Sequence, residues 1–260
     1  MADYPFVKGH GTENDFVIVP AGVDLTPERV RALCDRRAGI GGDGVIRAVR
    51  GEDGRWFMDY RNSDGSVSEM CGNGIRLYAR YLHDHEGEPF PMEVGTRDGV
   101  KTLTVGEERG PVTVDLGAPR LLGETKVGVD GRSWSATHVD MGNPHAVAFV
   151  DDLADAGPLL TPPDHDPAVY PEGVNVEFVV RRGDAHVAMR VHERGSGETR
   201  SCGTGACAVM VAAALADGAA RDTDYRIDLP GGTLRITWTA DDRILMTGPA
   251  VLVAEGRTAL

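Results

Sequence analysis

Two of the four cysteines in the chain begin the same short motif, Cys-Gly-x-Gly. The motif occurs at 71–74 and again at 202–205, so its two copies lie half the chain apart. If a helix begins at each cysteine, the unpaired N–H groups and the dipole of its first turn lower the thiol pKa. The glycines allow a ligand to approach these N–H groups, which can hold a carboxylate. The pattern therefore predicts two acid–base thiols, Cys71 and Cys202, each beside a carboxylate-binding backbone.

Two such thiols suit the inversion of a carbon that lies α to a carboxylate. One thiolate removes the α-proton from one face of a small substrate, and the other thiol delivers a proton to the opposite face. Their roles exchange in the reverse reaction, so we expect two nearly equivalent bases. Preorganised N–H donors would stabilise the carbanion. No lysine stands in a comparable setting, so we expect no pyridoxal phosphate or other cofactor.

The sequence offset between the two motifs, called here the repeat offset, recurs elsewhere in the chain. The segments that begin at Gly11 and Gly142 are separated by the repeat offset, and so are those that begin at Gly117 and Gly248. Asn62 and Glu193 each precede their cysteine by nine residues. Several collinear matches indicate a tandem duplication rather than one coincidence of spacing.

Similar predicted elements follow the two motifs. Apolar residues at 75, 78, 79 and 82 have helical spacing, and 206–215 is apolar on all sides, which predicts a fully buried helix that ends near Gly218. Hairpin patterns come next, at 100–116 and 234–246. We therefore expect two pseudo-symmetric halves. The first covers residues 1–118, to which a C-terminal strand at 250–260 can be joined, and the second covers 119–249.

Composition excludes several classes of partner. The 260 residues carry a net charge of −13, which disfavours nucleic acid and anionic membrane surfaces. The N-terminus lacks the pattern of a signal peptide, and the longest apolar run, 206–216, is too short to span a bilayer. Four cysteines are too few for a disulfide scaffold. We therefore expect a cytoplasmic protein with free thiols.

The remaining two cysteines are interpreted differently from the motif pair. Cys34 lies in a helical stretch and Cys207 lies inside the apolar helix, so we expect both to fill the core. Cys207 follows Cys202 by five residues, but no second cysteine pair matches this one, so we expect no metal site.

Taken together, the motifs resemble those of the diaminopimelate epimerase family over nearly the whole chain. The segments that carry the resemblance are 11–16 (GTENDF), 62–66 (NSDGS), 70–74 (MCGNG), 142–145 (GNPH), and 193–205 (ERGSGETRSCGTG). The resemblance implies an α/β (α+β) fold of two domains, each a barrel-like sheet around a central helix, with the active site between them. It also implies cofactor-independent interconversion of LL- and meso-diaminopimelate in lysine and peptidoglycan precursor biosynthesis, and a homodimer.

The resemblance assigns roles to individual residues of this chain. Cys71 and Cys202 correspond to the two acid–base residues, and His145 and Glu193 to groups that tune the thiol pKa values. The positions that match substrate contacts are Asn14, Asn62, Gly72, Asn73, Asn143, Asn175, Glu193, Arg194, Gly203 and Thr204. Arg194 suits a bidentate grip on the distal carboxylate, and the asparagines can both donate to and accept from the distal amino-acid end.

Two positions depart from the family's pattern. Gly44 stands where many members have glutamine, so one side-chain contact to the substrate is missing or is supplied by water. Thr12–Glu13 stands where a Leu-Gly pair is usual, which affects the shape of the loop before Asn14. Neither departure changes the two thiols.

Three other functions stay open on the sequence alone. A racemase of another amino acid, such as proline or histidine, would use the same thiols, but Arg194 and the asparagines favour a substrate with a second polar end. A dithiol redox protein would pair Cys71 with Cys202, although the chain contains no Cys-x-x-Cys motif. A binding protein could keep the fold without catalysis, although both cysteines are present.

Overall fold

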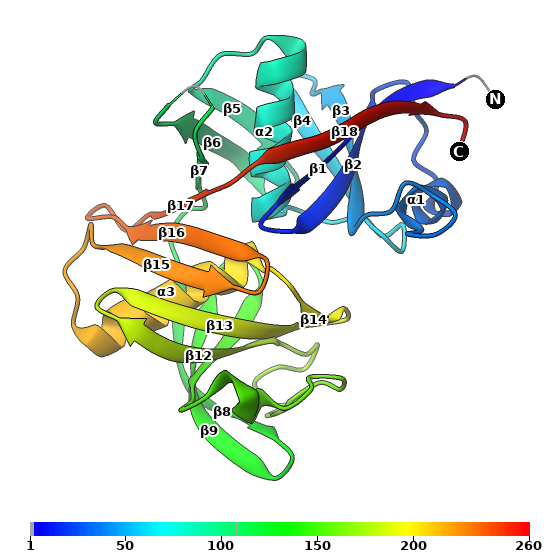
Figure 1. The fold of residues 1–260 in the computed structure, drawn as a ribbon. Coiled ribbons are helices and arrows are strands. Elements are labelled where there is room, and N and C mark those ends of the chain that lie inside the picture. The colour runs from blue at the N-terminus through cyan, green and yellow to red at the C-terminus, as the bar shows by residue number, and fades with distance from the viewer. Residues whose placement is uncertain (1–2, 108) are drawn as a thin grey trace. The chain divides into compact units, whose positions relative to one another are not determined.

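The computed structural model describes residues 3–107 and 109–260, which divide into two compact units (Figure 1). Unit 1 holds the described residues up to Asp115 together with Thr247–Leu260, and unit 2 holds Leu116–Met246. The two ends of the chain therefore belong to the same unit. Each unit contains one long helix and its own mixed sheet, and each is described here by itself.

Unit 1 joins strands from both ends of the chain into one sheet. Its order is β18–β1–β2–β3–β4–β5–β6–β7, with parallel pairs β2–β3 and β4–β5 and antiparallel pairs elsewhere. Its elements are β1 (Tyr4–Gly11), β2 (Asn14–Pro20), α1 (Pro27–Cys34), β3 (Gly44–Arg50), β4 (Trp56–Asn62), α2 (Gly72–Glu86), β5 (Met92–Thr96), β6 (Gly99–Val105), β7 (Val112–Asp115) and β18 (Val251–Thr258).

Unit 2 repeats this order with β8–β9–β10–β12–β13–β15–β16, where β10–β12 and β13–β15 are the parallel pairs. The strand β17 (Ile244–Gly248) leads the chain back to unit 1. The other elements are β8 (Arg120–Val129), β9 (Arg132–Asp140), β10 (Pro144–Phe149), η1 (Leu153–Ala156), β11 (Asp164–His165), β12 (Asn175–Gly183), β13 (His186–Glu193), β14 (Gly197–Thr199), α3 (Gly203–Asp217), β15 (Asp224–Leu229) and β16 (Gly232–Trp238).

The two units share one pattern of pairing, which confirms the predicted duplication and the mixed α/β fold. Their long helices, α2 and α3, are equal in length, and each begins at the first glycine of its Cys-Gly-x-Gly motif. In each unit the first strand of the order follows the strands of the other unit along the chain. β8 comes after the first repeat and pairs with β9 of unit 2, and β18 comes after the second repeat and pairs with β1 of unit 1.

Each long helix is buried within the sheet of its own unit. α2 packs against β1, β2, β7 and β18, which stand near both ends of the strand order, so the sheet curves around the helix. α3 packs against six strands of unit 2, and it is buried at Gly203 and from Gly205 to Ala214. Its side chains are small and apolar, and burial of each larger one contributes about 1.5–3 kcal/mol. The predicted helices at 75–82 and 206–215 are confirmed.

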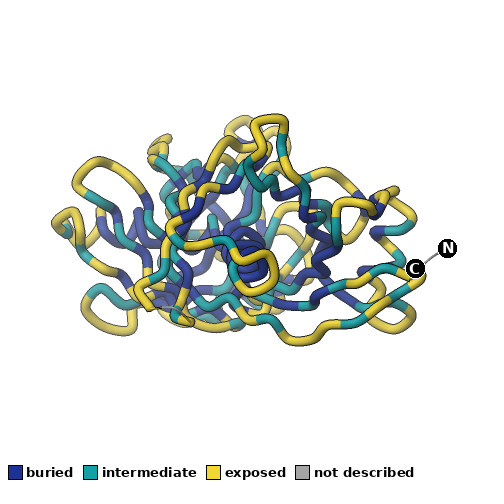
Figure 2. The backbone as a smooth tube through the Cα atoms, turned by 90° about the horizontal axis from the view of Figure 1, so that it is seen from above, coloured by how far each residue is buried: buried dark blue, intermediate teal, exposed yellow. Residues whose placement is uncertain are grey.

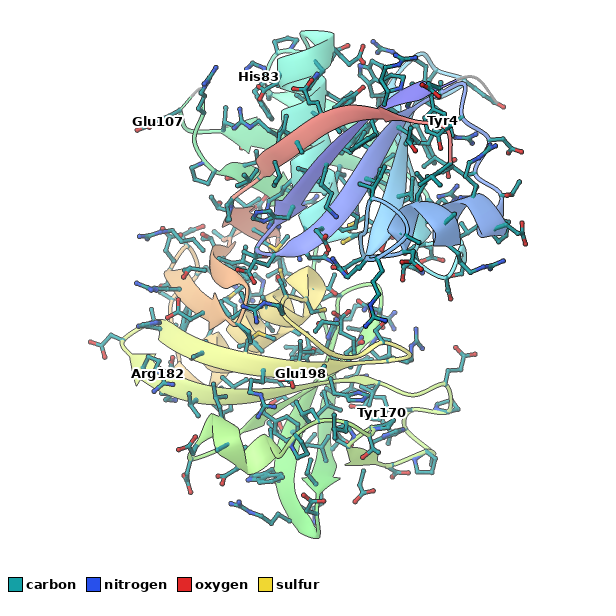
Figure 3. The ribbon with its side chains drawn as sticks, turned by 45° about the vertical axis from the view of Figure 1, so that its right-hand side comes forward. Tyr4, His83, Glu107, Tyr170, Arg182 and Glu198 are labelled. Carbon is teal, nitrogen blue, oxygen red and sulfur yellow. The ribbon has the colours of Figure 1, made fainter. Side chains whose placement is uncertain are left out.

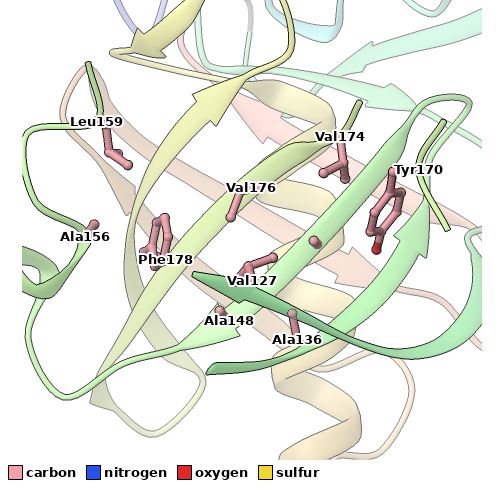
Figure 4. Close-up of a cluster of buried hydrophobic side chains, with 10 residues drawn as sticks. Val127, Ala136, Ala148, Ala156, Leu159, Tyr170, Val174, Val176 and Phe178 are labelled. Atoms are coloured by element: carbon pink, nitrogen blue, oxygen red, sulfur yellow. The ribbon is translucent and has the colours of Figure 1, made fainter. Parts of the chain in front are cut away.

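Further apolar clusters fill the space on the other faces of the strands. In unit 2, Phe178 on β12, Val127 on β8 and Ala148 on β10 belong to one buried cluster (Figure 4). In unit 1, Cys34 at the end of α1 packs with Val30 and Leu33, which confirms its predicted place in the core. The buried positions alternate with exposed loops along the chain (Figure 2). Across residues 3–107 and 109–260, no helix has the length and apolarity needed to cross a membrane.

We predict that unit 1 depends on β18. A chain that ends at Gly248 leaves β1 without its antiparallel partner from Tyr4 to His10. Each lost backbone hydrogen bond removes about 1 kcal/mol, from a typical domain stability of about 5–15 kcal/mol. Limited proteolysis followed by mass spectrometry should then show fast cleavage within 3–115 and continued protection within 116–246.

The matched control ends at Thr258 and removes only the last two residues. Tyr4 loses the hydrogen bond that its hydroxyl donates to the Leu260 carbonyl at 2.6 Å (Figure 3), but β18 stays intact. We expect this variant to resist the protease as the full chain does. Equal protection of both units in the longer truncation would contradict a structural role for β18.

Candidate active site

Cys71 is the N-cap residue immediately before α2, at the helix start that the sequence predicts. Its backbone is extended (φ −140°, ψ 120°), and its sulfur accepts a hydrogen bond from the Gly74 N–H at 3.4 Å. The side chain is half-buried, whereas Gly72 and Asn73 in the first turn are buried. The thiol of Cys71 is thus held beside the backbone N–H groups at the start of the helix.

Asn14 connects this thiol to the rest of unit 1. Its Oδ1 lies 3.5 Å from the Cys71 sulfur and accepts from Asn73 Nδ2 at 3.3 Å. Its Nδ2 donates to Asp43 Oδ2 at 2.8 Å. Asn73 is fixed in turn by Arg76, a fully buried side chain of α2 that donates to Asn73 Oδ1 at 2.8 Å. The structure therefore brings three predicted site residues, Cys71, Asn14 and Asn73, into one hydrogen-bonded network.

The unusual Thr12–Glu13 pair forms the turn that presents Asn14. Gly11 and Asn14 are paired at the tip of the β1–β2 hairpin, and the two residues between them have φ values of 49° and 60°. Two-residue hairpins require this left-handed backbone, which costs a β-branched residue about 1–2 kcal/mol. Thr12 is buried, and its hydroxyl donates to Asn73 Oδ1 at 3.3 Å. The departure from the family's pattern thus keeps Asn14 in place.

Cys202 is the N-cap residue immediately before α3 in unit 2, but its surroundings differ from those of Cys71. The thiol is buried, and its sulfur lies 3.7 Å from the Thr204 hydroxyl. Burial raises the pKa of Cys202, and the carboxylates of Glu193 and Glu177 raise it further. The expectation that the helix start lowers this thiol's pKa is therefore wrong for Cys202, because desolvation and two nearby acids outweigh the helix N-terminus.

His145 lies on β10 and is fully buried, rather than in a surface loop. Its Nδ1 is 2.6 Å from Glu177 Oε1, and its Nε2 is 3.0 Å from Asn143 Oδ1. Burial raises the pKa of Glu177, an effect that the adjacent His145 opposes. A raised carboxyl pKa favours an arrangement in which the buried pair shares one proton and carries no net charge.

Glu177 is a site residue that the sequence analysis missed. A Cβ built on Gly205, in the first turn of α3, would lie 2.6 Å from Glu177 Oε1 and 3.2 Å from the Cys202 sulfur. The carboxyl and the thiol therefore approach the same glycine, which must lack a side chain. The other oxygen of Glu177, Oε2, has no hydrogen-bond partner among the described residues. The available signal was the one charged residue in the buried part of β12, residues 175–180.

The equivalent positions in unit 1 are apolar. Ile46 is the equivalent of Glu177 at the repeat offset, and Phe16 pairs with β3 at the position where His145 pairs with β12. A Cβ on Gly74 would lie 3.4 Å from the Phe16 ring and 3.5 Å from Ile46. The start of α2 thus rests on two apolar side chains, whereas the start of α3 rests on an ionisable pair. The two half-sites are not chemically equivalent.

Asn175 and Arg194 are in contact in unit 2. Asn175 Oδ1 accepts from the Arg194 backbone N–H at 3.0 Å, and its Nδ2 donates to the Pro144 carbonyl at 3.0 Å. The Arg194 guanidinium is exposed and lies 3.9 Å from a Glu172 carboxylate oxygen. Glu193 accepts a hydrogen bond from the Thr199 hydroxyl. Arg194 therefore has a fixed backbone and an accessible cationic end.

Other predicted residues have simpler positions. Gly203 and Thr204 form the first turn of α3, while Asn62 ends β4 and is hydrogen-bonded to Tyr60 and Ser66. Cys207 is buried inside α3, as expected. In the part of the chain that the structure describes, no three His, Cys, Asp or Glu side chains are grouped so as to hold a metal ion.

This geometry defines a duplicated protein with one helix-starting thiol in each unit, the arrangement of a two-base isomerase. The sequence profile of the diaminopimelate epimerase family matches the chain twice, at residues 6–122 and 137–253, and these two ranges are displaced by the repeat offset. The diaminopimelate epimerase of Streptomyces coelicolor is 59% identical, covering 96% of this chain and 94% of the relative. That of Corynebacterium glutamicum (strain R) is 44% identical and covers 98% of each chain. The chain belongs to the diaminopimelate epimerase family.

Solved structures with little sequence identity share the fold. A phenazine biosynthesis protein of the PhzF family from Bacillus anthracis superposes with a TM-score of 0.75 at 16% identity, covering all of both chains. A hydroxyproline epimerase from Agrobacterium vitis, solved with trans-4-hydroxy-L-proline, gives a TM-score of 0.73 at 14% identity, covering 99% of this chain and 93% of the other. These likenesses confirm the predicted fold class.

We predict that iodoacetamide, which reacts with thiolates, distinguishes the cysteines of the folded protein. Half-buried Cys71 should react first. Cys202 and Cys34 should react slowly near about pH 8, because burial raises the pKa of Cys34 to about 12 and that of Cys202 above its usual range. Labelling of Cys202 should accelerate at higher pH, as measured by mass spectrometry of the labelled peptides.

The Glu193→Gln variant tests the electrostatic contribution to this difference. Removal of a carboxylate that raises the Cys202 pKa should speed the labelling of Cys202 severalfold and leave that of Cys34 unchanged. Glu198→Gln is the matched control, since Glu198 pairs with Arg190 at 2.7 Å on the neighbouring strand (Figure 3). Equal rates in wild type and Glu193→Gln would refute the effect of Glu193 on this thiol.

Proposed function

We propose that this protein interconverts LL- and meso-diaminopimelate by two-base proton transfer at one α-carbon. The observation that carries the proposal is the equivalent placement of Cys71 and Cys202, each as the residue that starts the buried helix of its unit. Full-length similarity to diaminopimelate epimerases supports this substrate. The activity belongs to the biosynthesis of lysine and peptidoglycan precursors.

In the proposed reaction one cysteine is a thiolate and the other a thiol. The thiolate takes the α-proton, and the electron pair of the C–H bond passes to the α-carbon and its carboxylate. The thiol on the opposite face then gives its proton to the α-carbon, which forms the inverted product. Each turnover leaves the protons exchanged between the two sulfurs, so the reverse reaction starts from the other base.

The first turns of α2 and α3 would hold the reacting carboxylate. The N–H groups of Gly72, Asn73, Gly203 and Thr204 lie at helix starts, where negative charge is stabilised. These donors also stabilise the carbanion as its charge moves onto the carboxylate. The thiols and N–H groups supply every step of this route, so the proposal requires no cofactor.

The asparagines and Arg194 would bind the distal amino-acid end of the substrate. A hydrogen bond to the side-chain amide orients each of the four asparagines, Asn14, Asn62, Asn143 and Asn175. The exposed guanidinium of Arg194 supplies two parallel donors for the distal carboxylate. A substrate with amino-acid groups at both ends uses all of these contacts.

His145 and Glu193 would adjust the protonation of the thiols. Glu193 raises the pKa of Cys202, which favours the thiol there. His145 would act through Glu177, which contacts its Nδ1 at 2.6 Å and whose carboxylate also raises the Cys202 pKa. We propose further that the protein acts in the cytoplasm, where reducing conditions keep the thiols free, and as a homodimer, as the family resemblance implies.

Turnover in D2O tests the two-base mechanism. We expect LL-diaminopimelate to gain one deuterium at the α-carbon as meso product appears, measured by NMR and mass spectrometry. Cys71→Ala and Cys202→Ala should each lower kcat by about three orders of magnitude, because each removes one proton-transfer group. Cys207→Ala serves as the control, since it removes a buried thiol within α3. Full activity in either motif variant would disprove the mechanism.

Arg194→Ala tests the substrate assignment. Loss of a charge-assisted contact should raise KM for diaminopimelate between about tenfold and a hundredfold. We also expect the wild-type protein to show no turnover of proline or histidine. Arg182→Ala, an exposed arginine on β12, is the matched control (Figure 3). Turnover of proline or histidine in place of diaminopimelate would favour the alternative, a racemase of another amino acid.

A further inference from the structure

We infer that Tyr60 is a positioning residue for Asn62, and that Gly44 is the space into which its ring fits. The inference rests on the proposed function, in which Asn62 contacts the substrate. It assigns a role to the one departure that removes a polar side chain from the site, the glycine at position 44. All of the residues that carry it lie in unit 1.

Strand register places these residues together. Gly44 on β3 pairs with Asn62 on the antiparallel β4, and Phe16 on β2 pairs with Gly44 on its other side. Tyr60 lies two residues before Asn62, so both side chains point to the same face of the sheet. The ring of Tyr60 can therefore lie diagonally across the position where residue 44 has no side chain.

Gly44 cannot carry a side chain in this arrangement. A Cβ built on it would lie 2.5 Å from Cε2 of Tyr60 and 2.5 Å from the Arg61 carbonyl oxygen. Carbon atoms that are not bonded do not approach this closely, so the ring or the strand would have to move. An aromatic ring lying over a glycine of the neighbouring strand is a known way to stabilise such a position.

The ring is held on its other side by Phe16. The two rings meet edge to face, with centroids 5.6 Å apart and planes at 79°, and Tyr60 is only 6% exposed. Phe16 also packs on Gly74 in the first turn of α2, three residues after Cys71. A continuous set of contacts therefore runs from the helix that carries the thiol to the phenol of Tyr60.

The Tyr60 hydroxyl fixes the amide of Asn62. It donates to Asn62 Oδ1 at 2.8 Å, while Asn62 Nδ2 donates to the Ser66 hydroxyl at 3.0 Å. These two bonds fix which end of the Asn62 amide is the oxygen and which is the nitrogen. One N–H and one oxygen lone pair are left for the substrate. Without the phenol, the amide could rotate and exchange its donor and acceptor.

Unit 2 reaches the same result with different residues. The positions equivalent to Gly44 and Tyr60 are Asn175 and Val191, since the β12–β13 register repeats that of β3–β4 at the repeat offset. There the residue on β12 carries the polar side chain, and Asn175 holds the backbone N–H of Arg194 at the end of β13. The diagonal residue is the smaller valine. In unit 1 the polar side chain is that of Tyr60 on β4, which orients Asn62 at the end of the same strand. In unit 2 it is that of Asn175 on β12, which holds the residue after the neighbouring strand β13.

Tyr60→Phe tests the role of the hydroxyl. We expect KM for diaminopimelate to rise about tenfold with kcat changed by less than about threefold, because one hydrogen bond that orients a binding group is lost. The melting temperature should stay close to that of the wild type, since the ring remains. Tyr225→Phe removes a similar buried hydroxyl bond, to Asp217 at 2.7 Å, and should leave KM unchanged.

Copying the residues of unit 2 into unit 1 tests the fit of the ring. Gly44→Asn alone should lower the melting temperature and the activity strongly. Gly44→Asn combined with Tyr60→Val should recover part of the melting temperature that Gly44→Asn loses, because the smaller side chain removes the clash with the ring but not the one with the Arg61 carbonyl oxygen. Independent, additive losses in the double variant would overturn the proposed contact between the two positions.

The outcomes separate this inference from the proposed function. A wild-type protein that epimerises diaminopimelate and a Tyr60→Phe variant with unaltered KM would overturn the role of Tyr60 and leave the function standing. A wild-type protein that does not act on diaminopimelate would overturn the proposed function, and the role of Tyr60 toward that substrate with it.

Discussion

The burial of a helix start inside each sheet is the constraint on which the rest of the structure depends. The first-turn N–H groups of a buried helix must find partners or a ligand, so the residues around them cannot be chosen freely. In unit 2 the sheet approaches the helix so closely that a Cβ at position 205 would lie 2.6 Å from Glu177, whereas a Cβ at position 74 of unit 1 would make ordinary contacts of 3.4–3.5 Å. In both units, strand residues lie against the helix turn that follows the cysteine.

The residues beneath the two glycines give the duplicated halves different chemistry. Gly74 rests on Phe16 and Ile46, whereas Gly205 rests on the carboxyl of Glu177, which is paired with His145. An epimerase does not require identical halves, because its two substrates are diastereomers whose reacting carbons have opposite configurations relative to the same distal stereocentre. A buried carboxyl–imidazole pair therefore lies near Cys202, whereas Cys71 contacts the Asn14 amide and the helix turn that follows it packs on apolar side chains.

The sequence predicts the features that depend on local pattern. The two cysteines before long helices, the duplication and the core position of Cys34 follow from spacing and periodicity and agree with the structure, and the family that the motifs resemble agrees with the relatives. Glu177 and Tyr60 were not predicted, because their roles depend on which strands are neighbours. The raised pKa of Cys202 was also missed, since the effect of burial cannot be judged from the helix start alone.

The exchange of end strands between repeats has a consequence for the order in which the chain can fold during synthesis. Unit 2 has all of its residues once Met246 has been made, but unit 1 must wait for β18, which ends two residues before the C-terminus. Until then β1 presents an open edge to the ribosome and to other nascent chains. The half that is translated first is therefore the half that is completed last, the reverse of the usual N-to-C order.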